Sequence, residues 1–136
     1  MEGSIFLLIF FVAFILNAIW EVLHYRLYRD LSGIPKYPHL LLATFTDALI
    51  ITSIFLVISF KNINLSWIQN PGFYDYSITI FLGLLVAAFI ETRALKTRRW
   101  EYKKAMPTIL GLGLSPLLQL ALTGILTLIV MRPAFY

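Results

Sequence analysis

The stretch Asn17-Ala18-Ile19-Trp20-Glu21-Val22-Leu23-His24-Tyr25-Arg26-Leu27-Tyr28 ends an apolar run that is long enough to cross a membrane. It places a carboxylate and an imidazole where lipid-facing residues would be expected. Four polar side chains share one face of a helix, because they are spaced 4, 3 and 4 residues apart: Asn17, Glu21, His24 and Tyr28. Since a polar stripe on an apolar helix avoids lipid, we predict that it faces other helices or an enclosed site.

The composition is that of an integral membrane protein. The 136 residues are 60% hydrophobic and 13% charged, whereas soluble domains are about 45–50% apolar and about 25% charged. The net charge of +4 does not indicate nucleic-acid binding, because the basic residues lie between apolar runs rather than along one soluble face. The absence of cysteine excludes disulfides, thiolate metal ligands and a thiol nucleophile. The length fits one domain, residues 1–136.

Four segments are long and apolar enough to cross a bilayer, which requires about 20 residues per helix. They cover approximately residues 5–25, 39–60, 76–95 and 106–131. We therefore predict an all-α fold, an up-down bundle of four transmembrane helices. All lysines and arginines except Lys61 and Arg132 lie near the first and third connections. The positive-inside rule predicts that these connections are cytoplasmic, and that both termini lie on the non-cytoplasmic side of a prokaryotic cytoplasmic membrane.

Three acidic residues and one histidine fall at a similar depth in these helices. Glu21 and His24 lie near the cytoplasmic end of the first span. Asp47 lies about two turns into the second span, and Glu91 about one turn before the end of the third. At a rise of about 1.5 Å per residue, all four lie within roughly 10 Å of the cytoplasmic boundary. A carboxylate at a helix centre costs about 2.5–3.5 kcal/mol unless it is paired, protonated, metal-bound or hydrated, so we interpret Glu21, Asp47 and Glu91 as candidate catalytic groups.

The last span contains a helix-breaking segment followed by a polar stripe. The segment Gly111-Leu112-Gly113-Leu114-Ser115-Pro116 predicts a kink, because proline removes a backbone donor and frees the carbonyl of Leu112. Three polar residues follow at spacings of four: Gln119, Thr123 and Thr127. We expect this stripe to face the interior of the bundle.

The third span and the linker after it supply further candidates. Gly83, Ala87 and Glu91 share one helix face, which predicts a close contact with a neighbouring helix. The linker holds Arg98, Arg99, Trp100 and Tyr102. Either arginine could hold an anionic headgroup, or could instead form a structural pair with Glu91. The two aromatic residues could instead be anchors at the membrane surface, which is the more common role of such residues.

Candidate ligand-binding residues surround the three acids: Asn17, His24, Tyr28, Arg98, Arg99, Trp100, Tyr102 and Gln119. A metal site is a further prediction, because Glu21 and His24 have the Glu-x-x-His spacing of di-iron bundles. Together with Asp47 and Glu91 they would suit a divalent iron, manganese or zinc ion. Glu21 and His24 could instead be a structural pair. His39, at a loop–helix junction, is expected to be solvent-exposed.

Four blocks of residues cover nearly the whole chain: Trp20-Glu21-x-x-His24-x-x-x-Tyr28, Ala43-Thr44-x-x-Asp47, Glu91 followed by Arg99-Trp100-x-Tyr102-x-x-x-Met106-Pro107, and Gly111-x-Gly113-Leu114-x-Pro116-Leu117-x-Gln119. This pattern resembles a group of small four-span bacterial and archaeal membrane proteins. The resemblance implies the four-span fold and brings no activity with it. The order of a glutamate and an aromatic Trp/Tyr-x-Tyr segment is also faintly similar to membrane-embedded carotenoid hydratases and cyclases, by analogy alone.

Three functions fit these patterns, and in each the lipid bilayer is a partner. The first is an intramembrane enzyme that acts on a lipid or isoprenoid ligand by acid–base or metal-assisted chemistry. The second is a structural or assembly subunit of a larger membrane complex or homo-oligomer, which the small size and the aromatic-rich composition favour. The third is a cation or proton transport module.

Overall fold

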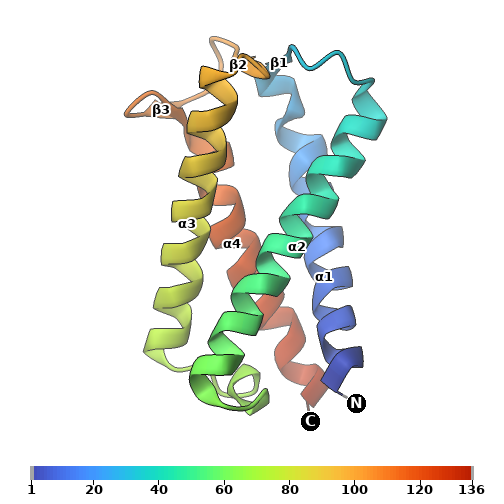
Figure 1. Ribbon diagram of the computed structural model, residues 1–136, viewed down its shortest axis with the longest axis vertical. Coiled ribbons are helices and arrows are strands. Elements are labelled where there is room, and N and C mark those ends of the chain that lie inside the picture. Colours follow the sequence, from blue (N-terminus) through green and yellow to red (C-terminus); the bar gives the residue numbers. More distant parts are fainter. Residues whose placement is uncertain (1, 136) are drawn as a thin grey trace.

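The computed structural model describes residues 2–135, and four helices dominate it (Figure 1). They are α1 (Glu2–His24), α2 (Lys36–Asn62), α3 (Phe73–Lys96) and α4 (Leu114–Met131). Each is long and apolar enough to cross a membrane. They run alternately up and down, so that both ends of the chain lie at the same end of the bundle. The predicted all-α bundle of four membrane-spanning helices is therefore confirmed.

Short elements connect the helices. Three are 3-10 turns: η1 (Tyr25–Leu27), η2 (Ser66–Ile68) and η3 (Arg132–Phe135). Four are strands: β1 (Tyr28–Asp30), β2 (Trp100–Tyr102), β3 (Thr108–Ile109) and β4 (Leu112–Gly113). We call the end of the bundle that carries β1 and β2 the strand end. The opposite end of the bundle, where the chain starts and finishes, is the terminal end.

The helices pack as two pairs. α1 packs mainly against α2, α3 mainly against α4, and the contact between α1 and α4 joins the pairs. α3 and α4 approach closely at Gly83, where an added Cβ would lie 2.7 Å from the backbone nitrogen of Ala121. This confirms the close contact predicted from the small residues of the third span. α2 and α3 contact each other much less, and Figure 1 shows α2 leaning away from α3 toward the strand end.

Apolar side chains fill the half of the bundle nearer the terminal end. The largest of those that are fully buried are Ile9, Ile51, Phe55, Ile58, Ile68, Leu128 and Met131. Trp67 of η2 closes this core, and its indole N–H donates to the Ser59 hydroxyl at 2.9 Å. The outward faces of the helices carry large exposed apolar side chains, among them Phe11, Phe81 and Phe89, as a lipid-facing surface should.

A two-stranded antiparallel sheet closes the strand end. β1 pairs with β2 so that Tyr28 lies opposite Tyr102, Arg29 opposite Glu101 and Asp30 opposite Trp100. Successive strand residues point to opposite faces. Arg29 and Glu101 therefore form an exposed ion pair at 2.9 Å, while the other four side chains face the bundle. The sheet fastens the connection after α1 to the connection after α3.

The predicted start of the fourth span is wrong. α4 begins at Leu114, and the residues before it form the β3–β4 hairpin. The hairpin loop is Leu110-Gly111, and both residues have positive φ, 52° and 81°, as in a tight type I′ turn. Pro116 therefore lies in the first turn of α4, where its missing N–H needs no partner. The predicted kink is absent, because Gly111 lies in the hairpin loop and Gly113 in β4, so that both glycines precede the helix rather than interrupt it.

Candidate functional site

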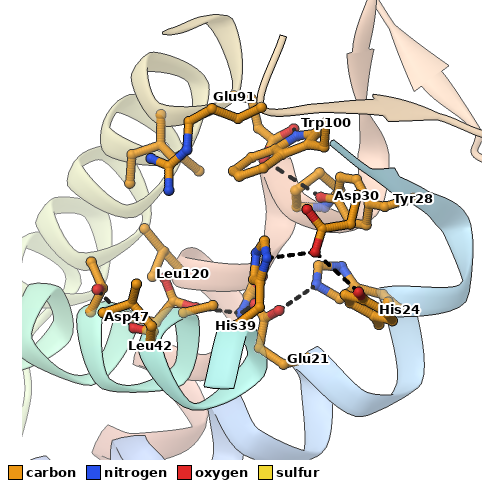
Figure 2. A pocket seen from close by; sticks show the side chains of 18 of the residues that line it. Glu21, His24, Tyr28, Asp30, His39, Leu42, Asp47, Glu91, Trp100 and Leu120 are labelled. Carbon is orange, nitrogen blue, oxygen red and sulfur yellow. Dashed lines mark hydrogen bonds and ion pairs between the residues drawn. The ribbon is translucent and has the colours of Figure 1, made fainter. Parts of the chain in front are cut away.

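A cavity of about 280 Å³ lies near the strand end, between the four helices and the β1–β2 sheet. Eight of the predicted site residues line it: Glu21, His24, Tyr28, Asp47, Glu91, Arg99, Trp100 and Gln119. Figure 2 shows the labelled acids and histidines arranged around this one space. The sequence predicted that the acids of α1, α2 and α3 lie at one depth in the membrane. In the structure these three acids line a single cavity.

Gln119 on α4 connects the acids of α1 and α2. Its amide nitrogen lies 2.8 Å from Glu21 Oε1 and 2.8 Å from Asp47 Oδ2. The same nitrogen lies 3.1 Å from Asn17 Oδ1, one turn deeper on α1. Because both oxygens lie against the same nitrogen, the carboxyl groups of Glu21 and Asp47 are close neighbours. Two carboxylates that lie this close repel each other, and one proton on either of them relieves the repulsion, so this acid pair is arranged to hold one proton between two acids.

His24 orients the Glu21 side of the acid pair. Its Nε2 lies 3.3 Å from Glu21 Oε2, and its Nδ1 lies 3.0 Å from the hydroxyl of Ser115 in the first turn of α4. Glu21 and His24 are both buried. A neutral imidazole with its proton on Nε2 donates to the carboxylate and accepts from the serine. The structural pairing of Glu21 with His24 therefore exists, and it lies inside the cavity wall.

Glu91 receives three donors from the sheet. The Tyr102 hydroxyl and the Trp100 indole N–H donate to Oε2, the latter at 3.3 Å. The Tyr28 hydroxyl donates to Oε1 at 3.5 Å. Within residues 2–135, Glu91 forms no ion pair with either arginine of the linker, so that alternative is wrong. The sheet holds this carboxylate in one position.

The two tyrosines remain protonated donors at neutral pH. Burial raises the pKa of Tyr28, and the negative charges of Glu91 and Glu21 raise it further. Burial also raises the pKa of Tyr102, together with the hydrogen bond that it donates to Glu91. An ordinary tyrosine already has a pKa near 10. Both phenols therefore keep their protons and their bonds to Glu91.

Asp30 and His39 form the rim of the cavity. His39 Nδ1 lies 2.7 Å from Asp30 Oδ2, and each side chain is 14% exposed. The expectation that His39 is solvent-exposed is wrong, because β1 brings Asp30 against the first turns of α2. Burial would raise the pKa of Asp30, but hydrogen bonds from the Ser32 hydroxyl and amide, and the charge of His39, lower it overall. Asp30 is therefore an anion at neutral pH.

The two arginines of the linker have different positions. Arg99 lines the cavity, and its guanidinium carbon lies 5.8 Å from the centre of the Trp100 ring. In the part of the chain that the structure describes, no carboxylate forms an ion pair with Arg99. Both arginines are exposed, but Arg98 has a positive φ of 52° and is not among the residues that line the cavity. Of the two candidate headgroup ligands, the structure brings Arg99 to the site.

The geometry does not support the predicted metal site at Glu21, His24, Asp47 and Glu91. Among residues 2–135, no group of three or more histidine and acidic side chains is arranged to hold a metal ion. The acids are instead satisfied by hydrogen-bond donors. The donors are the amide of Gln119 for the acid pair, and the phenols and indole of the sheet for Glu91.

Sequence patterns missed several polar residues of the site, among them Asp30, His39 and Ser115. Asp30 belongs to an Asp-x-Ser turn, in which the Ser32 amide donates to its carboxylate at 2.9 Å. The Asp-x-Ser pattern is visible in the sequence and predicts a turn, but it does not indicate that Asp30 lies at the rim of a cavity. The placement of Asp30 depends on its pairing with Trp100, which lies 70 positions later in the chain, and no local pattern reports that pairing.

No protein-family model, curated protein or solved structure matches this chain. The resemblance to small four-span bacterial and archaeal proteins therefore remains a prediction, and the chemistry of the cavity is the basis on which a function can be inferred.

Proposed function

We propose that this protein is an intramembrane enzyme that performs acid–base chemistry on a lipid or isoprenoid. The observation that supports this most strongly is the acid pair, in which one oxygen of Glu21 and one oxygen of Asp47 each lie 2.8 Å from the amide nitrogen of Gln119. General acid–base catalysis needs a proton donor and a proton acceptor within reach of one substrate. A carboxyl and a carboxylate side by side in a cavity supply both.

A carbon–carbon double bond is a suitable reacting group for such a pair. The protonated carboxyl transfers its proton to one carbon of the double bond, which leaves a carboxylate and a cation on the other carbon. A water molecule then bonds to the cation and loses a proton to the carboxylate, which completes a hydration. Loss of a neighbouring C–H proton to the carboxylate completes an isomerisation instead. Either route returns the acid pair to its starting protonation.

Glu91 has a separate role in this proposal. It is 4% exposed and is held by the indole of Trp100 and the hydroxyl of Tyr102. Its negative charge lies on the same cavity as the acid pair and would stabilise a developing cation. Because the sheet fixes the carboxylate before a substrate arrives, little reorganisation accompanies the reaction.

The packing of the terminal half favours an enzyme over the transport alternative. The hydroxyls of Thr123 and Thr127 each donate to a carbonyl of their own helix at 2.7 Å. The same half of the bundle holds fully buried apolar side chains such as Phe55 and Leu128. An ion or proton that entered from the cavity would meet a packed apolar core rather than a hydrated path.

The test compares lipid extracts from cells that express the wild type, Asp47→Asn or Glu101→Gln. Glu101 is an exposed acid outside the cavity and serves as the matched control. We expect a hydrated or isomerised lipid with the wild type and the control, and its loss with Asp47→Asn, when all three proteins accumulate equally in the membrane. A lipid profile that Asp47→Asn leaves unchanged, by mass spectrometry and chromatographic retention, would remove the acid pair from the chemistry.

A further inference from the structure

The cavity has an opening on the side of the bundle, between α2 and α3. Leu42 and Thr46 line it from α2, and Ile90 lines it from α3. Leu42 is 51% exposed and Thr46 is also exposed, so both lie at once on the cavity wall and on the outer surface. α2 and α3 make few contacts with each other, and α2 leans away from α3 toward the strand end (Figure 1). The opening therefore faces the region that lipid chains occupy.

The volume of the cavity limits what can enter through this opening. About 280 Å³ is just below the range of about 300–1,000 Å³ that is typical of pockets enclosing a drug-sized ligand. A membrane lipid is larger than such a ligand. One end of a lipid can therefore occupy the cavity, while the remainder of its chain stays in the bilayer outside α2 and α3.

The charges around the cavity indicate which end of the lipid enters. The acids each have partners, and His39 is paired with Asp30. Arg99 is a permanently charged side chain that lines the same cavity, packs on Trp100, and forms no ion pair with a carboxylate of residues 2–135. A guanidinium held against an aromatic ring binds phosphate through two parallel hydrogen bonds. An anionic phosphate is therefore the group that fits the rim at Arg99.

We propose that the cavity admits, sideways from the bilayer, the phosphate-bearing end of a lipid whose headgroup binds Arg99 and whose chain leaves between α2 and α3. The double bond nearest the headgroup then lies beside the acid pair. This inference rests on the proposed function for the reaction, but the binding step does not require the acids. The substrate class is a lipid that carries a phosphate headgroup and a double bond within a few bonds of it.

The test measures binding to the detergent-purified full chain by native mass spectrometry, with three matched probes. Farnesyl phosphate has the headgroup and the chain, farnesol has the chain alone, and inorganic phosphate has the charge alone. We expect farnesyl phosphate to bind, farnesol to bind about tenfold or more weakly, and inorganic phosphate neither to bind nor to displace it. Equal binding of farnesol, or displacement by inorganic phosphate, would overturn the proposal.

Two pairs of variants locate the binding. Arg99→Gln should weaken farnesyl phosphate binding about tenfold, whereas Arg98→Gln, which changes an exposed arginine off the cavity, should not. Thr46→Phe fills the opening and should weaken binding, whereas Leu49→Phe, on the same helix but away from the cavity, should not. Unchanged binding in both Arg99→Gln and Thr46→Phe would refute the site.

Asp47→Asn separates this inference from the proposed function. If Asp47→Asn binds farnesyl phosphate like the wild type and leaves the cellular lipid profile unchanged, the lipid site stands and the acid chemistry fails. If farnesyl phosphate fails to bind the wild type while Asp47→Asn abolishes a lipid product, the acid chemistry stands and the phosphate-headed substrate fails.

Discussion

Replacing Gln119 by methionine should loosen the contact of α4 with α1 and α2. Methionine keeps the length of an unbranched side chain and removes the amide, whose nitrogen lies 2.8 Å from one oxygen of Glu21 and 2.8 Å from one oxygen of Asp47. The NH₂ group has two hydrogens, so two bonds are lost. A side-chain hydrogen bond between membrane helices contributes about 0.6 kcal/mol on average and about 1.7 at most, which gives a loss of roughly 1–3 kcal/mol in the free energy of unfolding.

The assay is a titration of the micellar protein with sodium dodecyl sulfate, followed by circular dichroism of the helices. Thr127→Val is the matched control, because Thr127 is equally buried in α4 but donates to a carbonyl of its own helix. We expect the control to lose less than about 1 kcal/mol. A Gln119→Met variant that is as stable as the control would mean that the amide does not join the helices, and that the acids are satisfied in another way.

Three further outcomes are expected. Gly83→Ala should lower the free energy of unfolding by about 1–3 kcal/mol in the same titration, because the added methyl group would press on the α4 backbone. Gly3→Ala is the control and should leave the free energy of unfolding unchanged, because its methyl group would meet no neighbour. Tyr102→Phe should cost roughly 1 kcal/mol, since Glu91 loses a donor, and an unchanged titration midpoint would contradict the role given to that bond. Asp30→Asn should be less stable than the wild type at neutral pH. Because folding lowers the pKa of Asp30, the stability difference between wild type and variant is fully present above the unfolded pKa of about 3.9. It shrinks as the pH falls through the pKa of the folded protein. A stability difference that increased in acid would contradict this role of Asp30.

The four helices were predictable because the thickness of a bilayer sets their length. Residue counting at 1.5 Å per residue also placed Glu21, Asp47 and Glu91 at one depth. It failed at the start of α4, where Leu110 and Gly111, both at positive φ, form the turn of a hairpin and Gly113 lies in its second strand. Apolar composition does not distinguish a helix from a hairpin at the membrane surface, so the span appeared longer than the helix is.

The partners of the acids were harder to predict than their depth. A structural pair of Glu91 with an arginine of the linker was one alternative, but Glu91 meets Trp100 and Tyr102 instead, because β2 turns back over the end of α3. That reversal depends on the pairing of β2 with β1. The pairing brings together two connections that are far apart in the chain, and short polar segments such as these carry no pattern that encodes it.

The separation in sequence between Gln119 and the two acids that it contacts has a consequence for biosynthesis. Gln119 follows Glu21 by 98 residues and Asp47 by 72. At a synthesis rate of about 5–20 residues per second, the amide emerges from the ribosome roughly 5–20 s after Glu21 does. During that interval the first two helices carry carboxyl groups that lack their later donor, so the insertion machinery, water or a proton must shield them from lipid. A chain that stops before its last helix therefore displays the acid pair within the membrane without the amide of Gln119, a mark by which a quality-control protease could distinguish it from the finished protein.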